Sequence, residues 1–482
     1  MRPVLLVVMD GVGLKDGENR NAFFRAETPN IDSLMDSGFV QLEASGEAVG
    51  LPEGYQGNSE VGHLHLGAGR RVPQRLTRIN NAIENGKLAE KEALKSALER
   101  AERKDSAIHL AGIVSDGGIH GHIDHLEALM DIASDYDADV FIHCFTDGRD
   151  VPPKSAGKYL EQVESWCETY DAEIATVMGR YYSMDRDRNW ERTFKAYRAM
   201  ALGEGFQFES ISEPLEATYE GGDYDYFVRP SSRKSYSGME DDDEVIFYNY
   251  RADRERQIEE ELVADVDPDD FEEPVHPNFT SMFRYEEDIE TPAIFEKKIV
   301  EDTLGEKVED NGYSQLRVAE SQKIPHVTYF FNGQRELEFE HEDREFVESD
   351  KIKAYDQAPE MHADEIAGKV VDAVEEGSHD FILLNFANGD LVGHTGEMDA
   401  AVTAMETVDR NVGRLVDAVD GTDYAMLVTS DHGNCEDMGP EDDPNTSHTT
   451  NPVPLTYFNA DVDAEDGELW EVANLVERIM DL

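Results

Sequence analysis

The sequence has little cysteine, little positive charge and no long hydrophobic run. Three of its 482 residues are cysteine, an odd number without a Cys-x-x-Cys pair, which excludes a complete disulfide framework and favours a reducing compartment (Cys144, Cys167 and Cys435). The apolar run Val4–Met9 is far too short for a signal peptide or a membrane span, and no other apolar segment approaches the length of a membrane span. We therefore expect a protein of the cytoplasm.

Basic residues are scarce. There are 43 Lys and Arg against 105 Asp and Glu, and the formal net charge is −62. The acids lie in clusters along the chain, including 240–244, 265–273 and 441–443, rather than in one tail. Such a field repels nucleic acid and anionic membranes, so neither is expected as a partner. With 39% hydrophobic residues the chain should fold, and the acid excess resembles a salt-adapted cytosolic protein whose self-repulsion salt screens.

Short apolar runs rich in β-branched residues recur, each followed by a helical pattern. They predict strands at Val4–Met9, Ala107–Val114, Val140–Phe145, Ile174–Met178, Val245–Tyr248, Phe381–Phe386 and Ala425–Thr429. Strands of this apolar density, separated by helices, form parallel α/β sheets that are covered on both faces. Ligands bind beyond the carboxyl ends of such strands, and the polar motifs of this chain fall there.

Two changes of character divide the chain. Near 74–78 a Gly-rich segment gives way to a long charged helical pattern, and around 292–298 a new helical segment is expected to begin. A middle domain of about 77–297 therefore interrupts the flanking segments 1–76 and 298–482. The middle segment holds most Arg-bearing motifs and the flanks hold the Ser, Asp and His motifs. An inserted domain would place the two chemistries on opposite walls of one cleft.

Ser59, within Gly57–His63 (GNSEVGH), is the candidate nucleophile. Small residues precede it and a helix-compatible stretch follows, which places the hydroxyl near a helix N-terminus, where free N–H groups and the dipole favour phosphate. A serine hydroxyl is a poor nucleophile unless a base or a metal ion lowers its pKa. No Gly-x-Ser-x-Gly elbow is visible, so metal activation is favoured. For this serine alone, an ordinary helix cap is the alternative.

Asp and His residues follow several of the predicted strands or lie in a nearby loop. Asp390 and His394 are four residues apart, so one helical turn would bring both to one face. A lone Asp at a strand end is more often a cap or turn former. Together these residues suit two divalent ions, with manganese favoured and zinc or cobalt possible, and paired metals suit in-line phosphoryl transfer. The set comprises Asp10, Asp390, His394, Asp431, His432 and His448.

The middle segment repeats a strand followed by polar and mostly basic residues. Guanidinium groups bind carboxylate and phosphate in a bidentate manner, so a small substrate carrying both groups is expected. For any single arginine, a local ion pair with a nearby aspartate is the alternative. The four stretches are Ser115–His120, Asp147–Asp150, Gly179–Arg186 and Asn249–Arg254.

With these residues, the chain resembles the cofactor-independent (2,3-bisphosphoglycerate-independent) phosphoglycerate mutases of the alkaline phosphatase superfamily. The resemblance covers nearly the whole chain, and its long motifs occur in the same order as in the family. They are Leu51–Gly54 leading into Gly57–His63, Val114–His120, His122–Leu126, Asp147–Ala156, Met178–Arg188, Trp190–Arg192, His326–Gly333, Asp390–Gly396 and His448–Pro454.

The resemblance implies a two-domain α/β fold, an alkaline-phosphatase-like parallel-sheet phosphatase domain (1–76 and 298–482) with an inserted α/β transferase domain (77–297). It implies one metal site of Asp390, His394 and His448 and another of Asp10, Ser59, Asp431 and His432. The implied substrate contacts are His120, Arg149, Asp150, Arg180, Arg186, Arg251, Arg254 and Lys323.

The implied activity is interconversion of 3-phosphoglycerate and 2-phosphoglycerate, a step of glycolysis and gluconeogenesis, through a phosphoserine at Ser59. Asp150 would act as general acid and base, and Lys323 would stabilise the transferring group. Two divalent ions, a monomer and no bisphosphoglycerate are expected. The alternatives are a related metal-dependent phosphatase or phosphopentomutase, and a non-catalytic acidic binding or scaffold protein. Several positions depart from the family pattern, among them His65, which could add an imidazole near the metals, and Gly389, where Pro is usual.

Overall fold

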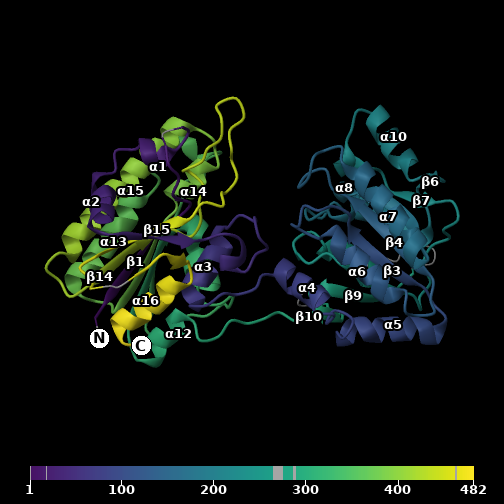
Figure 1. The fold of residues 1–482 in the computed structure, drawn as a ribbon, viewed down its shortest axis with the longest axis horizontal. Coiled ribbons are helices and arrows are strands. Elements are labelled where there is room, and N and C mark those ends of the chain that lie inside the picture. Colours follow the sequence, from purple (N-terminus) through teal and green to yellow (C-terminus); the bar gives the residue numbers. More distant parts are fainter. Residues whose placement is uncertain (1, 18, 264–274, 286–288, 462–463) are drawn as a thin grey trace. The chain divides into compact units, whose positions relative to one another are not determined.

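The computed structural model describes residues 2–482 except 18, 264–274, 286–288 and 462–463, so the acidic stretch 265–273 lies outside the described residues. The chain forms two compact units (Figure 1). We call Met1–Thr77 with Ile299–Leu482 the split unit and Arg78–Lys298 the inserted unit. Each unit is built on its own β-sheet with helices packed against it.

The sheet of the split unit has β1 at its centre, and its strand order is β12-β11-β13-β1-β14-β15-β2-β16. The strands from β12 to β14 are parallel, whereas β15 runs antiparallel to both β14 and β2. The bounds are β1 (Val4–Met9), β2 (Phe39–Glu43), β11 (Gln315–Glu320), β12 (Glu342–Val347), β13 (Phe381–Phe386), β14 (Ala425–Thr429), β15 (Val453–Phe458) and β16 (Gly467–Glu468).

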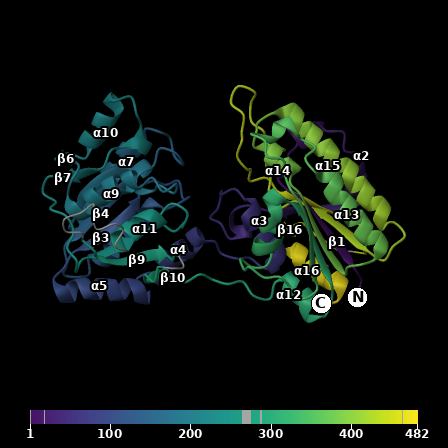
Figure 2. The same cartoon turned by 180° about the vertical axis from the view of Figure 1, so that it is seen from behind.

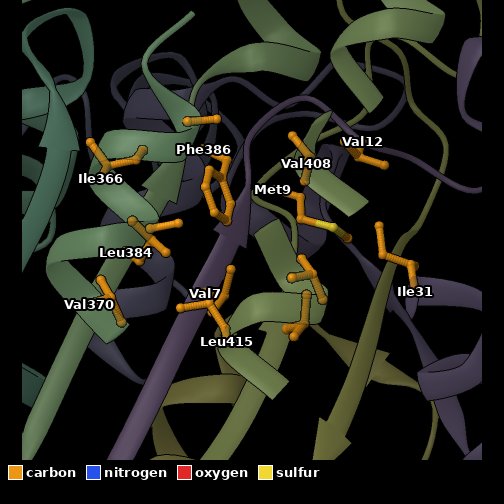
Figure 3. Packing of buried hydrophobic residues seen from close by; sticks show 14 of the residues in the cluster. Val7, Met9, Val12, Ile31, Ile366, Val370, Leu384, Phe386, Val408 and Leu415 are labelled. Atoms are coloured by element: carbon orange, nitrogen blue, oxygen red, sulfur yellow. The ribbon is translucent and has the colours of Figure 1, made fainter. Parts of the chain in front are cut away.

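Successive residues of β1 alternate between two hydrophobic clusters, one on each face of the sheet. On one face, Val7 of β1 and Leu384 of β13 pack with Val370 of α13 and Leu415 of α15 (Figure 3). Each fully buried aliphatic side chain contributes roughly 1.5–3 kcal/mol. The helices are α1 (Ala22–Arg25), α2 (Pro29–Ser37), α3 (Ser59–Ala68), α12 (Leu304–Asp310), α13 (Ala363–Glu376), α14 (Asn388–Gly393), α15 (Met398–Val419) and α16 (Glu471–Met480).

The sheet of the inserted unit has the order β10-β9-β8-β3-β4-β5-β7-β6, parallel except between β5 and β7. Helices α6 and α7 lie in front of it in Figure 1, and α9 and α11 are in front in Figure 2, which views it from behind. The strands are β3 (Ile108–Ile113), β4 (Val140–Thr146), β5 (Ala172–Gly179), β6 (Phe206–Phe208), β7 (Ser231–Arg233), β8 (Glu244–Phe247), β9 (Asn278–Phe283) and β10 (Ala293–Phe295).

The remaining helices belong to the inserted unit, except that α4 spans the change of unit between Thr77 and Arg78. They are α4 (Arg75–Glu84), α5 (Glu92–Lys104), α6 (Ile123–Ala133), α7 (Ala156–Tyr170), α8 (Arg180–Ser183), α9 (Trp190–Leu202), α10 (Ser212–Glu220) and α11 (Arg256–Val263). No helix among the described residues is long and apolar enough to cross a membrane. The three cysteines are buried, unbridged thiols.

The predicted α/β class is confirmed, and three of the predicted strands have the bounds of β1, β13 and β14. Both sheets are mainly parallel, as predicted, and antiparallel pairings at β15 and β7 extend them. One expectation was wrong. The segment 292–298 does not begin a helix: it contains the edge strand β10, and the next helix, α12, begins at Leu304.

Candidate metal centre and anion-binding site

The site of the split unit lies at the carboxyl ends of four adjacent parallel strands. Asp10 follows β1, Lys323 closes a short 3₁₀ turn after β11, α14 follows β13, and Asp431 comes just after β14. Because β11, β13, β1 and β14 are neighbours and parallel, these ends meet at one edge of the sheet. The topology therefore gathers side chains that are hundreds of residues apart in sequence.

Ser59 is the first residue of α3, and the helix is capped by its neighbour. The Asn58 side chain accepts the N–H of Val61 at 3.0 Å, so the serine hydroxyl is not used as the cap. Ser59 Oγ instead donates to Asp10 Oδ1 at 3.0 Å and accepts from Lys323 Nζ at 2.8 Å. The helix-cap alternative therefore does not describe this serine.

One cluster of donors comprises Asp390, His394 and His448. Asp390 Oδ1 lies 3.0 Å from His394 Nε2 and 3.2 Å from His448 Nε2, and the two Nε2 atoms are 3.1 Å apart. Each Nδ1 meets a backbone carbonyl, that of Thr446 or Gly57, which turns Nε2 toward the cluster. Bonds of about 2.1 Å to one ion would need such spacings, so these residues could hold a divalent cation.

A second cluster is centred on His432, which is fully buried. Its Nε2 lies 2.9 Å from Ser59 Oγ, 3.4 Å from Asp10 Oδ1 and 3.7 Å from Asp431 Oδ2. Burial lowers the pKa of His432, but the carboxylates of Asp431, Asp10 and Asp390 outweigh it and raise the pKa to about 10. The surrounding carboxylates favour positive charge here, and Asp10, Asp390 and His432 offer donor atoms close enough together to share a divalent ion.

Lys323 joins the two clusters. It is only 3% exposed, and Nζ lies 2.8 Å from Asp10 Oδ1 and 2.7 Å from Asp390 Oδ2. Burial alone would lower the pKa of Lys323, but Asp10 and Asp390 raise it above its usual value, so the ammonium stays charged. The same contacts help to hold the pKa of both carboxyl groups low despite their burial.

The predicted stray imidazole of His65 does not reach either cluster. Its Nδ1 donates to the carbonyl of Val61 at 2.8 Å, and its Nε2 accepts the N–H of Val72 at 3.0 Å. Burial lowers the pKa of His65 to about 4, which suits this neutral bridging role. The side chain ties the end of α3 to the following loop instead.

His63, which lies one helical turn after Ser59, was not among the predicted site residues. Its Nδ1 is 2.9 Å from the Ser59 carbonyl and 3.1 Å from Asp431 Oδ2, and it is fully buried. Asn385, on β13, lies beside it and donates to Asp10 Oδ2 at 2.7 Å. The four-residue spacing from Ser59 was the available signal for His63, but an asparagine inside an apolar strand gave none for Asn385.

The buried anchor of the inserted unit is Arg180, which is 1% exposed. Its Nη1 donates to Asp147 Oδ1 at 2.7 Å and also to Asp150. Asp147 Oδ1 accepts the N–H groups of Arg149 and Asp150, which fixes the turn after β4. Burial would raise the pKa of Asp147, but Arg180 and these hydrogen bonds lower it, so the carboxylate stays ionised.

A second group surrounds Asp253, after β8. Its carboxylate pairs with Arg186 at 3.1 Å and with Arg251 at 3.2 Å. The Nδ1 atom of His120 lies 3.9 Å from Asp253 and 3.3 Å from the buried carboxylate of Glu255. The local ion pairs considered as an alternative for single arginines therefore exist here.

Arg254 differs from these paired arginines. It is 8% exposed, and Nη1 donates to the carbonyl of Met184 at 3.3 Å. Its pKa is lowered by burial first and then by the positive charges of Arg186 and Arg180, with a smaller effect from Arg149. Four predicted arginines are thus close enough to repel one another, as expected of a site that receives an anion.

Comparison with known proteins gives a consistent result. The profile of the metalloenzyme superfamily matches residues 2–478. The chain is 45% identical over 494 positions to the 2,3-bisphosphoglycerate-independent phosphoglycerate mutase of Moorella thermoacetica, covering 99% of this chain and 96% of that one. It is 42% identical over 477 positions to that of Haloarcula marismortui, covering 95% and 92%.

A solved structure is similar over almost the whole chain. It is Leishmania mexicana phosphoglycerate mutase at low cobalt concentration, with 30% identity, a TM-score of 0.71, and coverage of 99% of this chain and 95% of that one. The end-to-end match in sequence agrees with the motifs that carry the resemblance. The chain therefore belongs to the 2,3-bisphosphoglycerate-independent phosphoglycerate mutase family, within the metalloenzyme superfamily.

Proposed function

We propose that this chain interconverts 3-phosphoglycerate and 2-phosphoglycerate through a phosphoserine at Ser59. The observation that carries the proposal is the position of Ser59 Oγ, at the N-terminus of α3 and within 3.0 Å of Asp10, Lys323 and His432. Membership of the mutase family supports the choice of substrate. The same serine favours a covalent route over direct hydrolysis by water.

The metal ligands of this proposal are the two clusters of the split unit. Asp390, His394 and His448 would hold one divalent ion, and Asp10, Ser59, Asp431 and His432 the other. When bound, such ions lower the pKa of a serine hydroxyl and neutralise charge on phosphoryl oxygens. Mixed carboxylate and imidazole donors favour manganese, with zinc and cobalt as alternatives.

The residues of the split unit account for both phosphoryl transfers. Ser59 Oγ, as the alkoxide, attacks phosphorus, the bond to the glycerate oxygen breaks, and that oxygen takes a proton from Asp150. The buried Lys323 ammonium would stabilise the negative charge that spreads over the phosphoryl oxygens. The other glycerate hydroxyl then attacks phosphorus, and Ser59 is released. No bisphosphoglycerate is consumed, because the enzyme carries the phosphoryl group itself.

The inserted unit would retain the glycerate between the two transfers. Arg149, Arg180, Arg186, Arg251 and Arg254, with His120, are the proposed contacts for its carboxylate and hydroxyl groups. Asp150 would give a proton to the glycerate oxygen that leaves phosphorus and take one from the hydroxyl that attacks it in the second transfer. In this proposal the split unit is the phosphatase domain, with predicted bounds 1–76 and 298–482. The inserted unit, predicted as 77–297, is the transferase domain.

The decisive test is an assay of the purified full chain with 3-phosphoglycerate, manganese and potassium chloride, without bisphosphoglycerate. We expect 2-phosphoglycerate to form, detected by coupling to enolase, and a phosphorylated Ser59 peptide in mass spectra of quenched enzyme. Chelation should abolish turnover, and manganese should restore it. Phosphate release without isomerisation would favour a phosphatase instead. Absence of both reactions would refute the enzymatic proposal.

We further propose a cytoplasmic monomer adapted to high salt. The support is the net charge of −62, because self-repulsion grows as the Debye length increases in dilute salt. The melting temperature should therefore rise with potassium chloride concentration. A melting temperature that stays flat or falls as salt is added would contradict salt adaptation. A dimer in sedimentation at high salt would contradict the monomer.

A further inference from the structure

Glu436 is a fully buried carboxylate whose hydrogen-bond donors come from the loop after β1 and from two stretches of the long connection between β14 and β15. Its Oε2 accepts the backbone N–H of Gly13 at 2.9 Å and that of Asn434 at 2.7 Å. Its Oε1 accepts the hydroxyl of Thr449 and, at 2.9 Å, the amide N–H of Asn451. One side chain therefore connects the loop after β1 with both the beginning and the end of the β14–β15 connection.

Each of these loops carries proposed metal ligands. Gly13 lies three residues after Asp10, Asn434 lies two after His432, and Thr449 directly follows His448. The fourth ligand segment is reached through Asn434, whose side chain donates to Asp390 Oδ1 at 3.0 Å. Glu436 thus lies at the junction of the segments that bear both ligand clusters, although it belongs to neither.

The loops pack so closely around the Glu436 carboxylate that two of their positions have no room for a side chain. A Cβ atom added at Gly13 would lie 2.5 Å from the Glu436 carboxyl carbon, and one at Gly433 would lie 2.4 Å from Oε1. Only glycine permits this approach of the two loops to the carboxylate. The antiparallel bridge between Gly433 and Thr449, closed by a 3.0 Å hydrogen bond, joins the same loops.

A buried carboxylate is costly unless hydrogen bonds compensate its charge. None of the salt bridges found among the described residues involves Glu436, so its compensation comes from four neutral donors. A carboxylate suits this position because its two oxygens accept in diverging directions, two bonds each. An amide or a hydroxyl could not accept all four.

We propose that Glu436 is a positioning residue that holds the two metal-ligand clusters in a common geometry. The inference rests on the proposed metal centre. Replacement by glutamine would place an N–H₂ group against donors. The oxygen of the amide can still serve the two backbone N–H groups, so the mismatch falls on Thr449 and Asn451. The position of His448, and with it the Asp390–His394–His448 cluster, should suffer most.

The test is manganese binding to metal-free full-length protein, measured by titration calorimetry in high potassium chloride with elemental analysis of stoichiometry. Wild type should bind two ions. Glu436→Gln should weaken one of them by roughly 10- to 100-fold, as outer partners of metal ligands do. Thr449→Val removes one of the four donors to Glu436, together with a 3.3 Å contact from the Asn451 N–H to the same hydroxyl. It should weaken the same ion by less, and it decides the question if Glu436→Gln does not fold.

Asp409→Asn is the matched control, because Asp409 is also a buried carboxylate that accepts two backbone N–H groups, those of Asn30 and Ile31. It should lower the melting temperature without changing manganese affinity. If wild type and the folded Glu436 and Thr449 variants bind manganese with equal affinity, Glu436 has only a structural role. That result would overturn this inference but leave the proposed metal centre in place. Wild type that binds no manganese would overturn the metal centre as well.

Discussion

The two units differ in the burial of their charged side chains, which are mostly buried at the site of the split unit and partly exposed at that of the inserted unit. In the split unit, Asp10 and His432 are fully buried and Lys323 is 3% exposed. Each of the three lies within hydrogen-bond distance of Ser59 Oγ. In the inserted unit, the side chains of Arg186 and Arg251 are 49% and 51% exposed. The buried set is fixed by the fold before any ligand arrives, whereas the exposed arginines can adjust to a ligand.

This difference matches the chemistry proposed for each unit. Phosphoryl transfer requires an in-line arrangement of nucleophile and charges, and small displacements are expensive in rate. Retaining a small glycerate that must change orientation requires charge rather than a rigid shape. Arg180 is the exception within the inserted unit, because its buried pair with Asp147 resembles the split unit. Substitutions at the two kinds of site should therefore fail in different ways.

The largest effect is expected at Ser59. Ser59→Ala should lower mutase turnover by at least about 10⁴-fold, because it removes the phosphoryl acceptor. Few packing atoms are lost, and three proposed ligands of the second ion remain (Asp10, Asp431 and His432), so the circular dichroism spectrum and the manganese content should stay close to those of wild type. Ser281→Ala, at a buried serine of β9, is the control and should keep its activity. Near wild-type turnover in Ser59→Ala would refute the phosphoserine route.

Arg180 should show the next largest effect, in stability as well as in activity. Arg180→Met leaves the buried carboxylate of Asp147 without its cation, at a cost of about 3–5 kcal/mol in the free energy of unfolding. Arg251→Ala removes an exposed ion pair and should change that free energy by less than about 1 kcal/mol. Urea unfolding at constant salt measures both. Equal losses in the two variants would erase the distinction between anchor and exposed arginine.

Arg254 separates substrate retention from metal binding. Arg254→Ala should cost roughly 1.5–3 kcal/mol of transition-state stabilisation, or about 10- to 150-fold in kcat/KM, through loss of one charge-assisted contact. Manganese affinity should not change, and some phosphate should be released as glycerate escapes. Enolase-coupled kinetics and a phosphate assay measure the two outcomes. Unchanged kinetics would remove Arg254 from the proposed substrate site.

The strands at the centre of both sheets could be predicted, because their apolar runs are continuous and end in polar motifs. Val4–Met9 and Phe381–Phe386 are buried along their whole length and carry the signal of a central parallel strand. Edge strands were missed: β12 (Glu342–Val347) is partly exposed and charged, and β16 has only two residues. Their pairing is decided by the neighbouring strand rather than by their own sequence.

For the site, residues in polar motifs near the ends of predicted strands could be predicted, whereas Asn385, inside the apolar strand β13, could not. Asp390 and His394 could be paired from their spacing, and the structure places them 3.0 Å apart. Glu436 could not be found, because its role depends on the loop after β1 and on two distant stretches of the β14–β15 connection, which meet only in the folded chain. Sequence spacing reveals contacts within one turn of helix, but contacts between distant loops follow from topology.

The smallest effect concerns acid sensitivity within the inserted unit. His143 of β4 is fully buried between His109 and Thr176, with hydrogen bonds of 3.0 and 2.9 Å. Burial, and then the neighbouring His109, hold the pKa of His143 well below the usual range. In the unfolded chain the pKa returns to about 6.5. Below that pH, His143 is protonated in the unfolded chain but stays neutral in the folded chain. The stability that is present above about pH 6.5 is therefore lost as the pH falls.

One such group contributes at most about 1.4 kcal/mol per pH unit. His143→Gln can keep a hydrogen bond to either neighbour without titrating. It should therefore reduce the slope of the free energy of unfolding against pH between about pH 7 and pH 5, by up to the amount that one proton contributes. Urea unfolding at constant salt measures this slope. His341→Gln, at an exposed histidine, is the control and should keep the wild-type slope. If His143→Gln and wild type have the same slope, the acid sensitivity does not arise in this sheet, and the metal ligands of the split unit become the place to look for it.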